Sequence, residues 1–201
     1  MKTSIFSKVT AGIQRELMKE SAYLLPLRIF IGIGWIRAGL EKFMEAGWPR
    51  GTALLDFFNQ QISGGHVVFP FYQRLITQMF APHAYGLSWL IMIGQLLVGI
   101  AVLTGTLTNF ALICGLFMNF NFILAGAITP SAFYVVIQIV LSVMNSGRVL
   151  GGDELLSRYI PVGLLVAQPY YTRRFWVFEK VMFLIAAAGS ALAAFMAVPY
   201  I

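Results

Sequence analysis

Four charged residues lie within one long apolar stretch of the chain, residues 23–44. They are Arg28, Arg37, Glu41 and Lys42. A charge near the centre of a bilayer costs roughly 2.5–3.5 kcal/mol on insertion scales, and such residues usually face a bundle interior, a partner or a wet cavity. Side chains of this kind hold anions, donate hydrogen bonds or carry protons. The sequence therefore predicts a functional site around this stretch.

The four charges fall on two faces of the expected helix. Arg37 and Glu41 are four residues apart, so they share a face and can form an ion pair. Arg28 lies on the opposite face with Gly32 and Gly39, and we expect these glycines to permit close helix contact. We expect the Arg28 side chain to extend to the lipid headgroups. Arg37 and Glu41 are the predicted catalytic residues.

Three uncharged polar residues lie near the middle of other apolar segments: Gln95, Asn119 and Gln138. At about 1.5 Å per residue, they fall close to the depth of Arg37, so four helices would contribute to one polar layer. We predict that Gln95, Asn119 and Gln138 bind a substrate there, with Lys42 at the outer rim. Buried amides also bridge membrane helices without further function, and that alternative stays open for Asn119 and Gln138.

The composition is that of an integral membrane protein. Hydrophobic residues make up 59% of the chain and charged residues 11%, against about 25% charged in soluble domains. With 201 residues there is room for one helical bundle. The net charge of +6 comes from residues at the ends of apolar segments, which indicates membrane topology and not nucleic-acid binding.

Cysteine and histidine positions argue against a metal centre. Cys114 is the single cysteine, which excludes an intrachain disulfide, a zinc finger and a cysteine-ligated iron–sulfur cluster. His66 and His83 lie outside the apolar segments, so a haem buried in the bundle would lack its ligands. With Arg50 and Arg74 they would form either an anion or proton-exchange site, or ordinary loop polarity.

We predict an all-α bundle with five spans and an amphipathic N-terminal helix over residues 1–22. A disordered basic tail is the alternative for that first segment. Two short interfacial helices are expected in the long loop of residues 45–83, on either side of Gly64 and Gly65. The five expected spans are Tyr23–Met44, Ala84–Leu103, Leu107–Ile128, Ser131–Asn145 and Val177–Val198.

Lysine and arginine are most frequent in the N-terminal segment and between the fourth and fifth spans. Because cytoplasmic loops carry such an excess, we expect the N-terminus in the cytoplasm, with the long first loop and the C-terminus outside.

Spaced motifs occur along the four predicted helices and after the fourth. They are Leu27–Gly32, Gly39–Phe43, Ile93–Gly99, Leu103–Gly105, Met118–Gly126, and Gly147-Arg148 with Asp153. Together these motifs resemble the DoxX/DoxD family, and the long outer loop resembles its DoxD branch, the membrane subunit of thiosulfate:quinone oxidoreductase. Gln95 stands where the family pattern commonly has a glutamate, and Asn109 where it often has a basic residue.

The resemblance implies a four-helix core over residues 23–155, preceded by the amphipathic segment 1–22. Residues 156–201 would then supply a cytoplasmic connection and an additional fifth span. It also implies a quinone as substrate, and the motifs of the chain provide no metal or haem ligands. A prokaryotic inner membrane, or an intracytoplasmic or photosynthetic membrane, is the expected location.

Two functions are compatible with these features. The first is a quinone-linked oxidoreductase subunit, in which Arg37, Gln95, Asn119 and Gln138 donate hydrogen bonds and Glu41 carries protons outward. The second is an accessory subunit of a larger respiratory or photosynthetic complex without chemistry of its own. Small residues in the fifth span would dock other membrane subunits or a second copy of the chain. A transporter is less well supported, because no inverted repeat is evident.

Overall fold

The computed structural model describes residues 22–168, and every regular element within this range is a helix. The predicted fifth span, Val177–Val198, lies outside the described residues. So does the predicted amphipathic segment, apart from its last residue.

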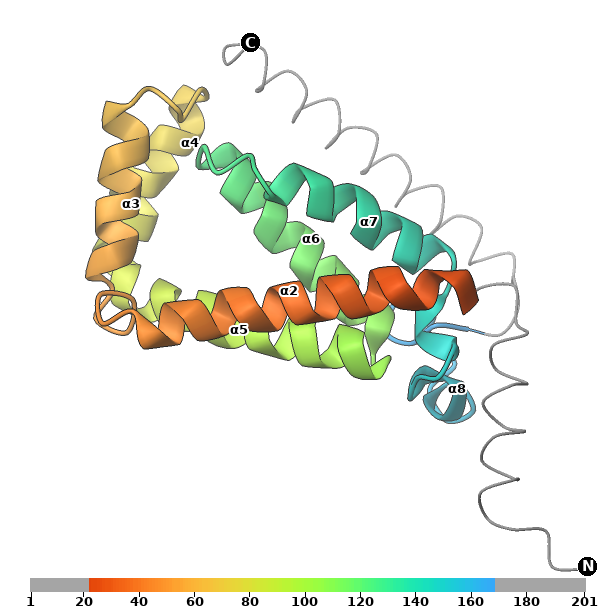
Figure 1. The fold of residues 1–201 in the computed structure, drawn as a ribbon. Helices are drawn as coiled ribbons and strands as arrows, with labels where there is room; N and C mark the ends of the chain where they lie inside the picture. The colour runs from red at the N-terminus through yellow and green to blue at the C-terminus, as the bar shows by residue number, and fades with distance from the viewer. Residues whose placement is uncertain (1–21, 169–201) are drawn as a thin grey trace, which may run out of the picture.

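Four long helices pack side by side, as Figure 1 shows. They are α2 (Leu25–Met44), α5 (Ala84–Thr104), α6 (Thr108–Leu124) and α7 (Ser131–Val143). The most extensive contact joins α2 to α5, while α6 packs against both α5 and α7. These helices lie where the first four apolar segments predicted them.

Two helical stretches are long and apolar enough to cross a membrane. They are Ala22–Met44 and Pro70–Thr104, whereas α6 and α7 are shorter apolar helices. Large apolar side chains on the outside of the bundle include Ile33, Leu97 and Phe133, exposed by 53%, 62% and 59%. An apolar outer surface of this kind suits contact with lipid chains and agrees with a membrane location.

Glycines bring α2 and α5 into close contact. A Cβ added to Gly99 would lie 2.8 Å from the carbonyl oxygen of Gly32 and 2.7 Å from the backbone nitrogen of Ile36. A Cβ added to Gly39 would lie 2.8 Å from Leu96. The predicted close-contact face of the first long helix is therefore confirmed.

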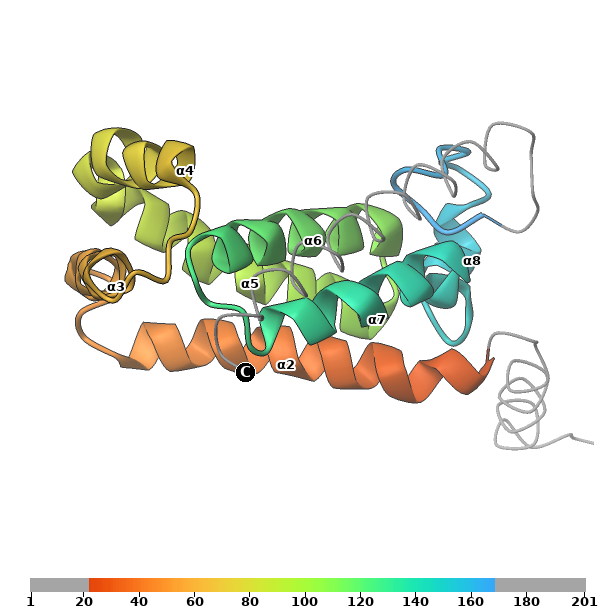
Figure 2. The ribbon, with the colours of Figure 1, turned by 90° about the horizontal axis from the view of Figure 1, so that it is seen from above.

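The loop between α2 and α5 folds into two helices, as predicted. They are α3 (Thr52–Ser63) and α4 (Pro70–Leu75), and short π and 3-10 turns continue α4 into α5. Figures 1 and 2 show α3 and α4 at one end of the bundle, with α8 (Asp153–Leu156) at the other. The indole N–H of Trp89 donates to the Pro49 carbonyl at 3.1 Å, which ties the start of α5 to the loop.

The α2–α5 contact generates a stability prediction. We expect Gly99→Ala to lower the free energy of unfolding by about 1–3 kcal/mol, because the new methyl group would meet backbone atoms that cannot move cheaply. Gly86 is the matched control on the same helix, because a Cβ there meets nothing within 4 Å. Thermal unfolding in detergent, followed by circular dichroism, measures both variants. Equal midpoints for the two alanine variants would show that the contact is looser than described.

Candidate functional site

The inside of the bundle contains a cavity of about 550 Å³ near the α3–α4 end. This volume lies within the range of pockets that enclose small organic ligands. Its wall comes from the second half of α2, the first half of α5, the second half of α6, the start of α7 and the two loop helices. Aromatic side chains are the commonest kind in the wall: Trp35, Trp48, Phe57, Phe58, Tyr72, Phe80, Phe117, Phe122 and Tyr134.

Two of the predicted polar residues reach this wall together. Gln95 on α5 and Asn119 on α6 both line the cavity, and each is only 2% exposed. The Asn119 amide donates to Oε1 of the buried Gln138 on α7, at 3.0 Å. The structure thus brings together the three amide side chains that the sequence placed in one layer.

Three buried polar atoms in this region have no hydrogen-bond partner among the described residues: Trp35 Nε1, Gln95 Oε1 and Gln138 Nε2. Leaving a buried donor or acceptor unpaired costs about 1–3 kcal/mol. Two of these atoms belong to residues that line the cavity, Trp35 and Gln95. Because an amide offers both N–H and C=O, Gln95 suits either a carbonyl or a hydroxyl group.

Lys42 lines the cavity farther toward the α3–α4 end, as predicted for the outer rim. Its Nζ lies 3.4 Å from the Ala38 carbonyl oxygen, a long hydrogen bond. It also lies 4.9 Å from the centre of the Trp48 ring, a cation–π distance. The ammonium group is therefore held at the wall by one weak acceptor and one aromatic face.

Arg37 and Glu41 form the expected ion pair, with Arg37 Nε 2.6 Å from Glu41 Oε1. The pair lies apart from the cavity that Gln95 and Asn119 line. Their side chains are 79% and 54% exposed, and neither lines the cavity. The cavity-facing side of α2 carries Trp35 and Lys42, which are seven residues apart, and Arg37 points away from that side. The two residues predicted to be catalytic therefore do not contact a ligand bound in this cavity.

Several aromatic residues of the wall were not predicted as site residues. Tyr72 of α4 donates from its hydroxyl to the Asn121 side-chain oxygen at 2.9 Å and contacts the Asn121 carbonyl oxygen at 3.1 Å. This contact fixes the loop helices over the end of α6. The regular spacing of Trp35, Ala38 and Lys42 on one helical face was the available signal for the orientation of α2.

A second polar cluster lies at the other end of the bundle and is centred on Arg28. Arg28 is 1% exposed, and its guanidinium donates to the carbonyl oxygens of Ser146 at 2.5 Å, Val149 at 2.7 Å and Leu150 at 3.3 Å. The expectation that this side chain reaches the headgroups is wrong. It is retained inside because the loop after α7 presents the Val149 and Leu150 carbonyl oxygens, to which no backbone N–H of the described loop donates.

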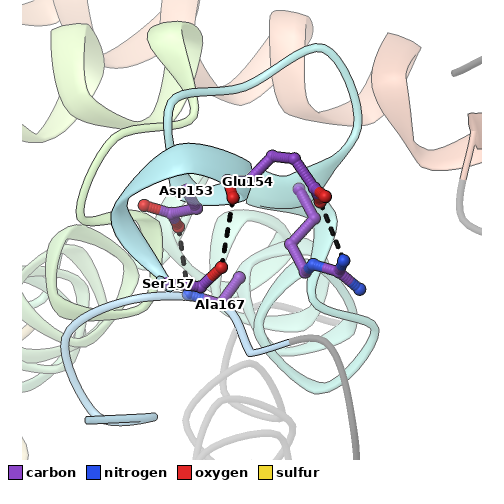
Figure 3. A network of polar contacts seen from close by, with 5 residues as sticks. Asp153, Glu154, Ser157 and Ala167 are labelled. Atoms are coloured by element: carbon purple, nitrogen blue, oxygen red, sulfur yellow. Dashed lines mark hydrogen bonds and ion pairs between the residues drawn. The ribbon is translucent and has the colours of Figure 1, made fainter. Parts of the chain in front are cut away.

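Asp153 supplies the negative charge of the same cluster. Its Oδ2 accepts hydrogen bonds from the backbone N–H groups of Thr108 and Ala167, each at 3.1 Å, and Figure 3 shows the contact with Ala167. Thr108 begins α6, so the carboxylate caps this helix and interacts with its dipole. Burial raises the pKa of the Asp153 carboxyl, and the hydrogen bonds from Ala167 and Thr108 partly offset that rise.

Comparisons of the chain with protein-family models, with curated proteins and with solved structures found no match. Within residues 22–168, no group of three or more histidine, cysteine, aspartate or glutamate side chains could hold a metal ion. The chemistry of the cavity therefore follows from its aromatic wall, its amides and Lys42.

The Arg28 cluster generates a second stability prediction. Arg28→Met should lower the free energy of unfolding by about 3–5 kcal/mol, because it leaves carbonyl groups unpaired and a buried carboxylate without its cation. Arg50→Met, at an exposed position in the first loop, is the matched control and should unfold like the unmodified protein. Guanidine- or urea-induced unfolding in detergent gives the comparison. A stable Arg28→Met variant would contradict the structural role of this arginine.

Proposed function

We propose that the protein is a multi-pass membrane protein that binds a quinone or a similar ring compound in its aromatic cavity. In this proposal it acts as a membrane subunit of a quinone-linked oxidoreductase resembling the DoxD type. The observation that carries the proposal is the cavity itself, in which Gln95 and Asn119 lie in a mostly apolar wall that is rich in aromatic side chains. Ligand sites of this class are mostly apolar, with a few polar groups that fix orientation.

The wall residues can perform distinct parts of quinone binding. Aromatic side chains suit the faces of a ring, in offset or edge-to-face contact. The Trp35 N–H, which has no partner among the described residues, can donate to one carbonyl oxygen of a quinone. The Gln95 amide can donate to a quinone or accept from the corresponding quinol, so the same side chain serves both redox states.

The residues that carry the family resemblance support a shared architecture. A Cβ added to Gly147 would lie 2.4 Å from Asp153 Oδ2, and a Cβ added to Gly105 would lie 3.1 Å from Arg28 Nη1. Residues from three separate motifs therefore meet in the Arg28 cluster. Gly105 and Gly147 leave no room there for a larger side chain. This is the arrangement expected if the motifs mark a common fold.

The electrons for quinone reduction must come from outside the cavity. The sequence contains no dinucleotide-binding fingerprint, so a partner or the second substrate supplies them. Thiosulfate is the second substrate that the resemblance suggests. Arg50 and Arg74 are exposed at the α3–α4 end, where their charge would attract an anion.

The exposed ion pair on α2 favours a second candidate function, that of an accessory subunit within a larger complex. Arg37 and Glu41 are exposed on a helix that is long and apolar enough to span a membrane. Charges that face lipid are costly, whereas a partner helix can shield and hydrogen-bond them. In this alternative the outer face of α2 binds a neighbouring subunit.

Substitution of Gln95 tests the quinone site. Gln95→Leu should weaken binding of a short-chain quinone about tenfold and lower thiosulfate-dependent quinone reduction, because the wall loses its amide. Gln78→Leu makes the same chemical change at an exposed position outside the cavity, so it serves as the control. Equilibrium dialysis in detergent measures the affinity. Unchanged affinity in Gln95→Leu would remove the proposed site.

Substitution of the ion pair tests the accessory role. Replacing Arg37 and Glu41 together by leucine should release partner subunits during mild solubilisation, because the interface loses its charged pair. The described bundle should stay folded, since both side chains are exposed. Native mass spectrometry of the purified membrane fraction reports the change in composition. A monomer without partners, for both the unmodified and the double-leucine protein, would contradict the accessory role.

A further inference from the structure

Among the residues that the structure describes, the wall of the cavity carries one cation and no anion. Lys42 lines the wall, and none of the residues that the structure places in the wall is an aspartate or a glutamate. The rest of the wall is apolar or neutral, so the charge of Lys42 is not balanced within the cavity. A bound ligand can supply that balance.

The acidic residues nearest to Lys42 in the sequence, Glu41 and Glu45, attract its ammonium group electrostatically but form no ion pair with it. Glu41 is bonded to Arg37 at 2.6 Å on the exposed face of α2. Glu45 follows the end of α2 and is exposed. Among the described residues, the contacts of the Lys42 ammonium are the Ala38 carbonyl and the Trp48 ring. An ammonium group has three donors, so at least one remains available to a ligand.

The distance of Lys42 from Trp35 and Gln95 determines how far apart the ring and the charged group of a ligand must be. Trp35 and Lys42 are seven residues apart on the same face of α2, which corresponds to about 10 Å along the helix. A ring between the aromatic side chains near Trp35 and Gln95 would therefore place a short substituent beside Lys42. Most other residues of the wall, among them Phe57 and Leu87, are apolar.

We infer that the ligand of this cavity is an acidic ring compound: its ring lies at Trp35 and Gln95, and a carboxylate or comparable anionic group on a short chain binds Lys42. The inference rests on the proposed function in that it uses the same cavity, and it specifies the class of compound that fits. An unsubstituted neutral quinone would leave the Lys42 charge unmatched. An ionised substituent at the rim matches that charge in an apolar setting, where a charge-assisted hydrogen bond is strongest.

A pair of matched probes tests this inference. One probe is a 1,4-naphthoquinone that carries a short carboxylic acid chain, and the other is its methyl ester, which has nearly the same shape without the charge. Equilibrium dialysis of the full chain in detergent at neutral pH measures the affinity for each. We expect the acid to bind about tenfold more tightly than the ester, and Lys42→Met to abolish that preference.

Two further variants separate the ligand contact from general effects. Lys42→Arg should retain the preference for the acid, because it keeps the charge. Arg74→Met removes an exposed positive charge at the same end of the molecule and should leave both affinities unchanged. Circular dichroism establishes that each variant is folded before binding is measured.

The outcomes distinguish this inference from the proposed function. Equal binding of acid and ester, with no effect of Lys42→Met, would overturn the inference and leave quinone binding intact. Binding of neither probe would overturn both. A saturated fatty acid, which has the carboxylate without the ring, is the third probe. Binding of that acid as tight as that of the naphthoquinone acid would overturn the assignment of a ring compound.

Discussion

The burial of Arg28 is the constraint on which the arrangement of the bundle depends. Its guanidinium binds the backbone carbonyl groups of Ser146, Val149 and Leu150 in the loop after α7, and so attaches that loop to the start of α2. Asp153, from the following segment, binds the start of α6. Removing either Arg28 or Asp153 alone would leave the other charge buried without its partner. Loss of one member of such a pair is strongly destabilising, so the cluster holds these segments together. The close glycine contacts along α2 and α5 extend from this end.

The two ends of the bundle consequently have different properties. At the α8 end, buried charges satisfy the backbone groups of helix termini and loops. At the α3–α4 end the same helices surround an aromatic cavity whose amides keep unpaired atoms. The loop helices cover this end through the bond between Tyr72 and Asn121. The same four helices therefore carry a cluster of buried charges at one end and the cavity at the other.

The sequence predicted the helices and part of the site. Apolar length and punctuating glycines located α2, α5, α6 and α7, and the four-residue spacing predicted the ion pair between Arg37 and Glu41. The amides Gln95 and Asn119 were found because polar groups are rare in such segments. Arg28 was misplaced because its partners are backbone carbonyl groups, which leave no trace in the residue types. The rotation of α2 was misjudged because charge was given more weight than the aromatic face of Trp35.

Photoaffinity labelling measures the central claim most directly, namely that a ring compound binds in the cavity between the helices. A short-chain azidoquinone, activated on the purified protein and followed by peptide mass spectrometry, reports which segments touch the ring. The structure predicts label on α2 near Trp35 and on α5 near Gln95, with excess unlabelled quinone competing for both. Label confined to the outer surface of the bundle, around Leu97 or Phe133, with no effect of the competitor, would contradict the account.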